Sequence, residues 1–252
     1  MRPVLFTIFG KEIYGYGTMI AIGIIAAILL LQHRVKKLDY DEDKIFSMAI
    51  IAVISGVLGG KLLFIITEIK SIIQDPSLLK DIKYGFVIYG AIIGGAIGVY
   101  IYSKKNKWKV LSIFDLVIPS IPLAQGFGRI GCFLAGCCYG RPTECSLGVE
   151  FKNSQFAPSG IHLHPTQLYS SAFDFLLFLF LIWYDKKNKK NGRVTAMYFI
   201  LYGIGRFLIE FLRNDPRGAV GSFSTSQFIS ILMVIVAIIV FNIDKIKLIK
   251  NK

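Results

Sequence analysis

Long apolar stretches alternate with short polar segments along the whole chain. Because a helix rises about 1.5 Å per residue, about 20 apolar residues cross the hydrocarbon core of a bilayer. The pattern predicts seven membrane-spanning helices, placed near Tyr14–Gln32, Ile45–Ile66, Phe86–Tyr102, Ile113–Ala135, Gln167–Tyr184, Val194–Leu212 and Phe223–Ile243. We therefore expect an all-α integral membrane protein with a single polytopic domain over residues 1–252.

The composition is typical of a membrane protein. Hydrophobic residues make up 54% of the chain and charged residues 18%, and the mean hydropathy is +0.58. A soluble domain is less apolar and has about 25% charged residues. The segment from Met1 to Lys11 lacks the features of a removable signal peptide, so we expect the first apolar segment to be retained as a helix.

Basic residues follow the odd-numbered spans and predict the orientation. The basic segments are His33–Lys37, Lys104–Lys109, Lys186–Arg193 and Lys245–Lys252. The positive-inside rule places the N-terminus outside, the C-terminus in the cytoplasm and residues 136–166 in an extracytoplasmic loop. The formal net charge of +13 is then explained by cytoplasmic loops, and no nucleic-acid partner is expected.

Polar residues within the predicted spans gather at one depth. With this topology, they all fall in the half of the bilayer that faces outward. The residues at this level are Tyr16, Lys61, Tyr89, Arg129, Gln167, Tyr169, Arg206 and Glu210. Ionisable groups at membrane depth are costly, so their convergence predicts a functional site at the outer leaflet.

Two helical faces have regular spacing. Tyr202, Arg206 and Glu210 are spaced i, i+4, i+8 and share one face of the sixth span. Gly90, Gly94 and Gly98 repeat every fourth residue on the third span, and Gly56 and Gly60 do so on the second. Small residues at this spacing favour close helix packing in membranes.

Arg129 and Arg206, with Lys61 as a weaker member, form a predicted cationic cluster. Arginine binds phosphate in a bidentate manner, and the phosphates at this depth belong to lipids. The alternative is structural: Arg206 pairs with Glu210 on its own helix, and Lys61 extends to the surface. Arg213 and Arg217 are interpreted as a solvated turn at the end of the sixth span.

The predicted outer loop contains cysteines and histidines. Cys137 or Cys138 is a plausible disulfide partner of Cys145, and Cys132 is expected to be a small buried residue. A metal site that includes the loop histidines remains an alternative, although the cysteine spacing is not a zinc spacing. These histidines are His162 and His164. Each histidine is either a base or ligand, or an interfacial residue satisfied by the backbone.

Several segments resemble the prolipoprotein diacylglyceryl transferase family. The similarity lies in GRIGCFLAGCCYGR from Gly128, YG at Tyr16, YGAIIGG from Tyr89, HPTQLY from His164 and YGIGRFLIEFLR from Tyr202. They occur in the order of the family and cover nearly the whole chain. The family's seven-helix, N-out topology also matches the predicted one.

The resemblance implies an enzyme of the bacterial plasma membrane with its active site facing the outer leaflet. The family transfers a diacylglyceryl group from phosphatidylglycerol to the lipobox cysteine thiol of preprolipoproteins, and glycerol 1-phosphate leaves. The expected partners are therefore phosphatidylglycerol, preprolipoprotein signal peptides and the bilayer. No metal or organic cofactor is expected.

The resemblance also assigns roles. Arg129 and Arg206 would hold the phosphate and stabilise the departing charge. The other expected catalytic residues are Glu210, Tyr89 and His164, and the expected substrate-binding residues are Tyr16, Arg129, Gly140, Tyr202, Arg206 and Gln167.

The chain departs from the family pattern at six positions. Tyr89-Gly90-Ala91 stands where the family usually has His-Gly-Gly, Cys132 and Ala135 where it has Asn, Cys137 where it has Glu, and Ser170 where it has an acidic residue. Thiol activation would then depend on His164, on Glu210, on a cysteine thiolate or on arginines that lower the pKa of the thiol.

Two further hypotheses follow from these departures. One is a divergent paralogue that uses an anionic phospholipid in another transfer. The other is a non-catalytic lipid-binding membrane protein.

Overall fold

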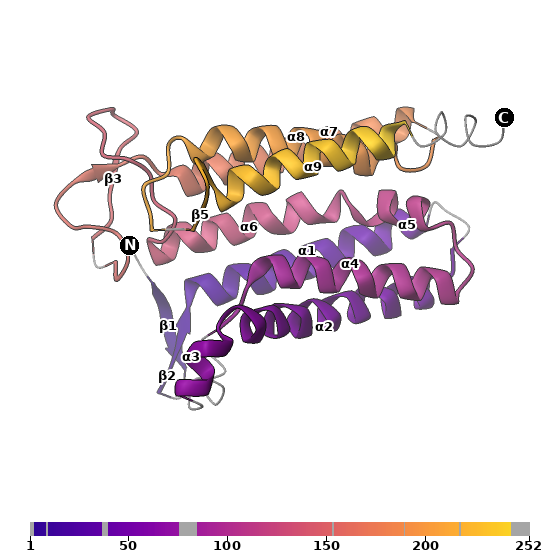
Figure 1. The fold of residues 1–252 in the computed structure, drawn as a ribbon, viewed down its shortest axis with the longest axis horizontal. Helices are drawn as coiled ribbons and strands as arrows, with labels where there is room; N and C mark the ends of the chain where they lie inside the picture. Colours follow the sequence, from indigo (N-terminus) through magenta and orange to yellow (C-terminus); the bar gives the residue numbers. More distant parts are fainter. Residues whose placement is uncertain are drawn as a thin grey trace. The chain divides into compact units, whose positions relative to one another are not determined.

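The computed structural model describes residues 3–8, 10–36, 40–75, 85–152, 154–188, 190–216 and 218–242. Within these ranges the chain is mostly helical, with helices α1 to α9 and three two-stranded antiparallel hairpins (Figure 1). The chain divides into two compact units. Unit 1 contains Met1–Leu31 and Asp115–Lys252, and unit 2 contains Gln32–Phe114.

Unit 1 is built around a row of helices. It contains most of α1 (Gly15–Val35), together with α6 (Ser120–Ala135), α7 (Thr166–Lys187), α8 (Arg193–Glu210) and α9 (Thr225–Phe241). Helix α7 packs against α6 and α8, and α9 packs against α8. The buried core of this row contains Ile118, Leu177, Leu181, Val194 and Tyr198.

The hairpins of unit 1 all lie at one end of its helices (Figure 1). They are β1–β2 (Val4–Ile8 and Lys11–Tyr14), β3–β4 (Val149–Glu150 and His162–Leu163) and β5–β6 (Ala219–Val220 and Phe223–Ser224). They precede α1, join α6 to α7 and join α8 to α9, so consecutive helices of the unit run in opposite directions.

A buried carboxylate stabilises the start of α8. Asp115 lies on α5 (Val110–Val117), whose first part belongs to unit 2. Its Oδ1 accepts hydrogen bonds from the Thr195 backbone N–H at 2.8 Å and the Thr195 hydroxyl at 2.7 Å. The first N–H groups of a helix have no intrahelical partner, so this carboxylate acts as a cap from another helix.

Unit 2 is a packed pair of helices. It contains α2 (Glu42–Thr67), α3 (Ile69–Gln74) and α4 (Ile88–Lys105), and α2 packs against α4. The predicted glycine faces meet here: a Cβ on Gly98 would collide with the Ser55 side chain, and one on Gly56 would lie 3.2 Å from the Ala91 carbonyl oxygen. Gly59, which the spacing argument missed, lies against Gly90 and Gly94.

Each predicted span corresponds to a helix, or to a pair of helices, and most boundaries agree to within a few residues. Within the described ranges, four stretches are long and apolar enough to cross a membrane: Gly15–Val35, Glu42–Thr67, Val110–Ala135 and Thr166–Lys187. Helix α9 is apolar but shorter, with 17 residues. The chain is therefore a helical membrane protein, while the number of seven spans and the orientation stay predictions.

The two prolines of the fourth span, Pro119 and Pro122, predict a kink, and the structure confirms it. The helix is interrupted at Pro119, between α5 and α6, because proline lacks an N–H and its ring displaces the preceding turn. The seventh span does not begin at Phe223, which belongs to β6. Instead, Ser224 and Gln227 form a capping box that starts α9 at Thr225.

The loop between α6 and α7 begins with a left-handed glycine. Gly136 has φ of 75° and donates its N–H to the Cys132 carbonyl at 2.9 Å, which ends α6. The loop has its own small core, in which Tyr139, Phe151 and Leu163 pack together. The loop ends at Pro165, because α7 begins at Thr166.

Replacing Gly59 with alanine is expected to destabilise unit 2. The added Cβ would collide with the Gly90 carbonyl oxygen and lie 3.0 Å from the Gly94 Cα, and backbone atoms cannot move aside as a side chain can. We expect a loss of about 1–3 kcal/mol, measured as a lower melting temperature in detergent.

Gly128→Ala is the matched control, because a Cβ on Gly128 meets no atom within 4 Å. Alanine has the higher helix propensity, so this variant should melt at or above the wild-type temperature. Equal melting temperatures for Gly59→Ala and the wild type would contradict the close packing of α2 on α4.

Candidate functional site

A small cavity lies between α6, α7 and α8. Its lining residues are Arg129, Ser170, Phe173, Asp174, Tyr202, Arg206 and Ile209. Its volume is about 10 Å³, which is room for about one water molecule. Two of the predicted site arginines therefore line one cavity, as the sequence analysis expected.

Arg206 is held from two helices. Its Nη2 lies 2.9 Å from Oε2 of Glu210, one turn further along α8, and donates to the Ser226 hydroxyl of α9 at 2.8 Å. Its Nη1 is buried and has no hydrogen-bond partner among the described residues. A buried N–H without an acceptor is costly, so this donor indicates a place for a ligand atom.

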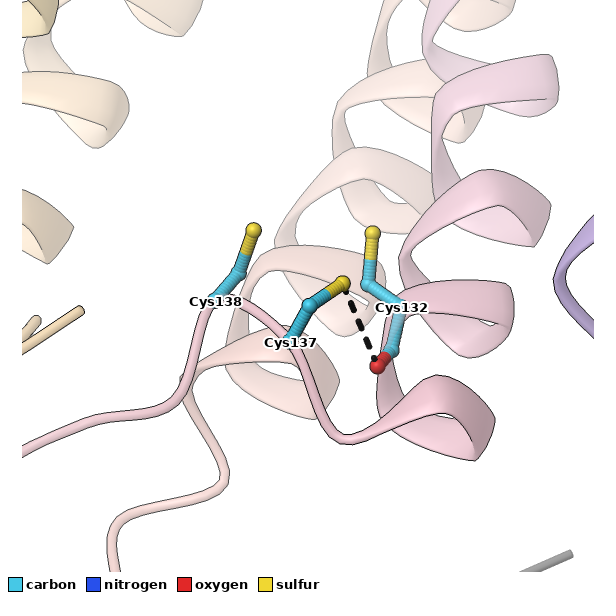
Figure 2. Close-up of side chains that lie close together, drawn as sticks. All are labelled: Cys132, Cys137 and Cys138. Atoms are coloured by element: carbon cyan, nitrogen blue, oxygen red, sulfur yellow. Dashed lines mark hydrogen bonds between the residues drawn. The ribbon is translucent and has the colours of Figure 1, made fainter. Parts of the chain in front are cut away.

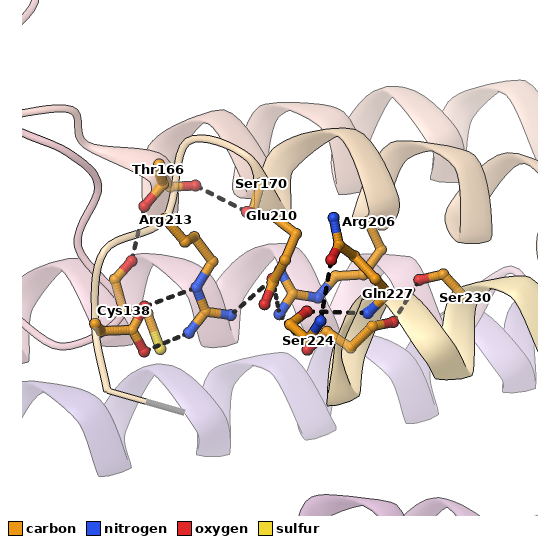
Figure 3. Close-up of polar contacts among 11 residues, drawn as sticks. Cys138, Thr166, Ser170, Arg206, Glu210, Arg213, Ser224, Gln227 and Ser230 are labelled. Carbon is orange, nitrogen blue, oxygen red and sulfur yellow. Dashed lines mark hydrogen bonds and ion pairs between the residues drawn. The ribbon is translucent and has the colours of Figure 1, made fainter. Parts of the chain in front are cut away.

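Further charged side chains follow Arg206 and Glu210 toward the end of α8 (Figure 3). Arg213 Nη1 lies 3.7 Å from Oε2 of Glu210, and its Nε and Nη2 donate to the two oxygens of Asp215 at 2.8 and 2.6 Å. The interpretation of Arg213 as part of a solvated turn is wrong, because its side chain is only 9% exposed and two carboxylates stabilise its burial. Arg217 lies outside the described residues.

Asp174 was missed by the sequence analysis. It is buried on α7, lines the cavity, and lies within electrostatic reach of Arg129 and Arg206. The available signal was a carboxylate in an otherwise apolar stretch, seven residues after Gln167. The lining thus contains two guanidinium groups and one carboxyl group.

Tyr202 also lines the cavity, as the shared helical face predicted. Its ring stacks on Tyr198 with centroids 5.3 Å apart, and the Tyr198 hydroxyl donates to Gln125 Oε1 at 3.2 Å. Arg129 lies within electrostatic reach of Tyr202, on the opposite helix of the cavity. The two tyrosines fix the wall of the cavity formed by α8.

The start of α7 holds the loop that follows α6. The Thr166 hydroxyl donates to the Cys138 carbonyl at 2.7 Å, and Gln167 Nε2 donates to the Cys137 carbonyl at 2.6 Å. The Oε1 atom of Gln167 is buried and has no hydrogen-bond partner within the described ranges. Gln167 thus orders the loop and keeps one acceptor unused.

His164 and Gly140 lie beside this segment but do not line the cavity. The Nδ1 of His164 is 3.3 Å from the Tyr169 hydroxyl, and the Gly140 N–H donates to the His164 carbonyl at 3.0 Å. A Cβ on Gly140 would lie 2.7 Å from the Cβ of His164, so the contact requires glycine. His162 is exposed on β4.

Three of the four cysteines form a cluster, which is drawn in Figure 2. The sulfur atoms of Cys132, Cys137 and Cys138 lie within 4.8 Å of one another. The predicted disulfide with Cys145 is not present, since all four thiols are free and Cys145 is exposed outside the cluster. Cys132 is buried, as expected.

The cluster also changes the metal alternative. Within the described part of the chain, these three cysteines are the group whose ligand atoms lie close enough to share one metal ion, and neither His162 nor His164 belongs to it. The guanidinium groups of Arg213 and Arg129 lie within electrostatic reach of the Cys138 thiol.

The remaining predicted site residues lie apart from the cavity lining. Tyr16 is in the first turn of α1, within electrostatic reach of Cys132 and Arg129, and the α1 backbone at Tyr16 approaches Gly131 closely. Tyr89 on α4 and Lys61 on α2 belong to unit 2. Their proximity to the arginine cavity stays a prediction.

Replacing Glu210 with glutamine is expected to destabilise unit 1 by about 3–5 kcal/mol, because Arg206 and Arg213 would lose the buried carboxylate that both approach. The measurement is the melting temperature in detergent. Glu150→Gln is the matched control: it removes a surface ion pair with Lys152 and should change stability by less than about 1 kcal/mol. Equal effects of the two substitutions would refute the importance of the buried network.

Comparisons with known proteins identify the family. The family model of prolipoprotein diacylglyceryl transferase matches residues 3–243. A phosphatidylglycerol–prolipoprotein diacylglyceryl transferase of Clostridium tetani is 64% identical over 245 residues, covering 97% of this chain and 98% of the relative.

Other relatives carry the same type of name. The protein named phosphatidylglycerol–prolipoprotein diacylglyceryl transferase 2 of Clostridium perfringens is 59% identical over 98% of this chain and 97% of its own length. A transferase of Finegoldia magna is 35% identical over 95% of this chain and 94% of its own length. The chain therefore belongs to the prolipoprotein diacylglyceryl transferase family.

Proposed function

We propose that this chain transfers the diacylglyceryl group of phosphatidylglycerol to the lipobox cysteine thiol of preprolipoproteins. A thioether forms and glycerol 1-phosphate leaves, as a step of bacterial lipoprotein maturation. The relatives named for this activity match the chain over nearly its whole length. The substrates proposed here are a membrane phospholipid and the signal peptide of the acceptor protein.

The observation that carries this proposal is the unused Nη1 of Arg206 beside the cavity that Arg129 also lines. When the glyceryl carbon is attacked, its C–O bond breaks and the phosphate oxygen gains negative charge. Two guanidinium groups in a dry site stabilise such charge effectively. Because the cavity has room for about one water molecule, lining side chains must shift to admit a phosphate.

The proposed roles follow from the contacts. Arg129 and Arg206 bind the phosphate, while Glu210 and Ser226 orient the Arg206 guanidinium. Tyr202 forms one wall of the phosphate site.

The other expected site residues lie around this wall. Gln167 and Gly140 stabilise the loop at which the peptide arrives, and Tyr16 lies nearby on α1. Proton-handling roles for His164 and Tyr89 remain part of the hypothesis.

We also propose the topology. All seven long helical segments span the plasma membrane within one polytopic domain, with the N-terminus outside and the C-terminus in the cytoplasm. The gathering of the three hairpins at one end of unit 1 supports a common outer side for the chain before α1, the α6–α7 loop and the α8–α9 loop. The cavity would then face the outer leaflet, where lipid donor and secreted peptide meet.

Purified protein in detergent is expected to transfer diacylglyceryl from phosphatidylglycerol to a synthetic lipobox peptide. Mass spectrometry of the peptide should show a thioether-linked adduct. Arg129→Ala and Arg206→Ala should each lower the rate at least about 100-fold, since each removes a charge that stabilises the transition state.

Arg193→Ala is the matched control, because Arg193 lies at the other end of α8, where its guanidinium packs on the Phe241 ring. Its rate should stay close to that of the wild type. Lipid binding that depends on Arg129, without any adduct, would overturn the transfer and favour a lipid-binding protein. Turnover of lipid without an adduct on the peptide thiol would favour another transfer reaction.

The exposed thiol of Cys145 tests the orientation. A membrane-impermeant maleimide should label it from outside in intact spheroplasts, and Cys145→Ser should lose most of the label. In that background, Lys107→Cys, in the loop after α4, should be labelled only after permeabilisation. Labelling of Cys145 only after permeabilisation would reverse the proposed orientation.

A further inference from the structure

The cysteine cluster is built by two unusual backbone positions. The left-handed turn at Gly136 ends α6 and returns the chain, so that the Cys137 thiol donates to the Cys132 carbonyl (Figure 2). Cys138 itself has φ of 60°, a backbone conformation that residues other than glycine and asparagine rarely adopt. Such backbone strain persists where surrounding contacts hold it, and it is often found at functional sites.

Hydrogen bonds from the start of α7 hold the backbone of the two cysteines in the loop. Thr166 and Gln167 donate hydrogen bonds to the carbonyl groups of Cys138 and Cys137, at 2.7 and 2.6 Å. Both donors are buried residues in the first turn of α7. Supporting hydrogen bonds of this kind orient ligand residues in metal sites.

The sulfur positions fit a thiophilic ion. With a Zn–S bond of about 2.3 Å, two thiolates on one tetrahedral zinc lie about 3.8 Å apart. The three sulfur atoms lie within 4.8 Å of one another, so shifts of up to about 1 Å, within reach of side-chain rotation, complete the geometry. A donor set of three thiolates selects zinc or another soft cation over magnesium or calcium.

The positive charges around the cluster also favour a bound zinc–thiolate group. Zinc with three thiolates carries one net negative charge, which is costly in a partly buried place. Arg213 and Arg129 both lie within electrostatic reach of Cys138 and would offset it. Arg129 additionally lines the small cavity with Arg206, so the cluster and the proposed phosphate site share one residue.

We propose that Cys132, Cys137 and Cys138 bind one Zn²⁺, and that the thiol of the lipobox cysteine occupies the fourth position. A zinc site with three protein ligands keeps a position for substrate, whereas a structural site is closed by four. The inference rests on the proposed transferase function and assigns its nucleophile activation. It departs from the family resemblance, which predicts no metal.

The reaction step is balanced without another reactant. The peptide thiol binds zinc and releases its proton to water, because a coordinating thiol is deprotonated. The sulfur then attacks the glyceryl carbon bonded to the phosphate oxygen. The C–S bond forms, the C–O bond breaks, and its electron pair leaves with glycerol 1-phosphate. Arg129 lines the cavity and lies within electrostatic reach of Cys138, so its charge would act on both the attacking sulfur and the departing phosphate.

The first test is the metal content of the full-length protein, purified with a reductant and without chelator. Elemental mass spectrometry should find about one zinc per chain in the wild type. Cys137→Ser and Cys138→Ser should lose most of it, whereas Cys145→Ser, outside the cluster, should retain it. Zinc that is absent from the wild type, or unchanged in both cluster variants, would overturn the site, as would a disulfide among the three thiols.

The second test is spectroscopic and uses wild-type protein, so it does not depend on the folding of variants. Cobalt exchanged for zinc should give the absorption of a tetrahedral thiolate site. A lipobox peptide should shift the thiolate-to-cobalt bands, and the same peptide with serine in place of its cysteine should not. Equal spectra with both peptides would refute the proposal that the peptide thiol is the fourth ligand of the metal.

Activity distinguishes this inference from the function on which it rests. Transfer that persists in zinc-free wild-type protein refutes the metal and leaves the transferase proposal intact. A loaded zinc site whose cobalt spectrum responds to the peptide, but with no transfer to it, refutes the transferase proposal and leaves the thiol-binding metal site intact.

Discussion

The burial of the Arg206 guanidinium constrains much of unit 1. A charge at this depth is stable only when it is paired and hydrogen-bonded. Glu210 provides the ion pair from the same helix, the Ser226 hydroxyl of α9 accepts a hydrogen bond, and the Asp174 carboxyl group of α7 lies within electrostatic reach. Helices α7, α8 and α9 must therefore keep their relative positions for the cation to remain stable. The same arrangement leaves Nη1 of Arg206 without an acceptor among the residues that the structure describes, so stability and ligand binding depend on the same contacts.

The loop after α6 is a second rigid element. It has a small apolar core around Phe151 and Leu163, and its cysteine carbonyls are bonded to the start of α7. Loops with exposed polar tips are usually mobile, but this one is ordered where it approaches the helices. Gly140 illustrates the reason: its backbone pairs with both His164 and Arg213, which joins the loop to the ends of α7 and α8.

Apolar patterning predicted the helices well, because about 20 apolar residues in succession have few alternatives in a membrane. Helical spacing also predicted that Tyr202, Arg206 and Glu210 share a face. Long-range contacts were not predictable in this way. Spacing alone carried no information on the left-handed turns at Gly136 and Cys138, and so the disulfide prediction with Cys145 failed. Asp174 was missed because its partners lie on other helices, and the burial of Arg213 depends on a bidentate pair with Asp215.

The charge of the cavity favours the product of the proposed reaction over its substrate. A phosphodiester carries one negative charge, whereas the phosphate monoester that leaves carries up to two. Arg129 and Arg206 both line the cavity, and the attraction between their guanidinium groups and the leaving phosphate grows as its second charge develops. Interactions that strengthen only toward the transition state accelerate the reaction, whereas equal binding of the substrate would not. Because Glu210 and Ser226 already fix the Arg206 guanidinium, little reorganisation is needed when that charge appears.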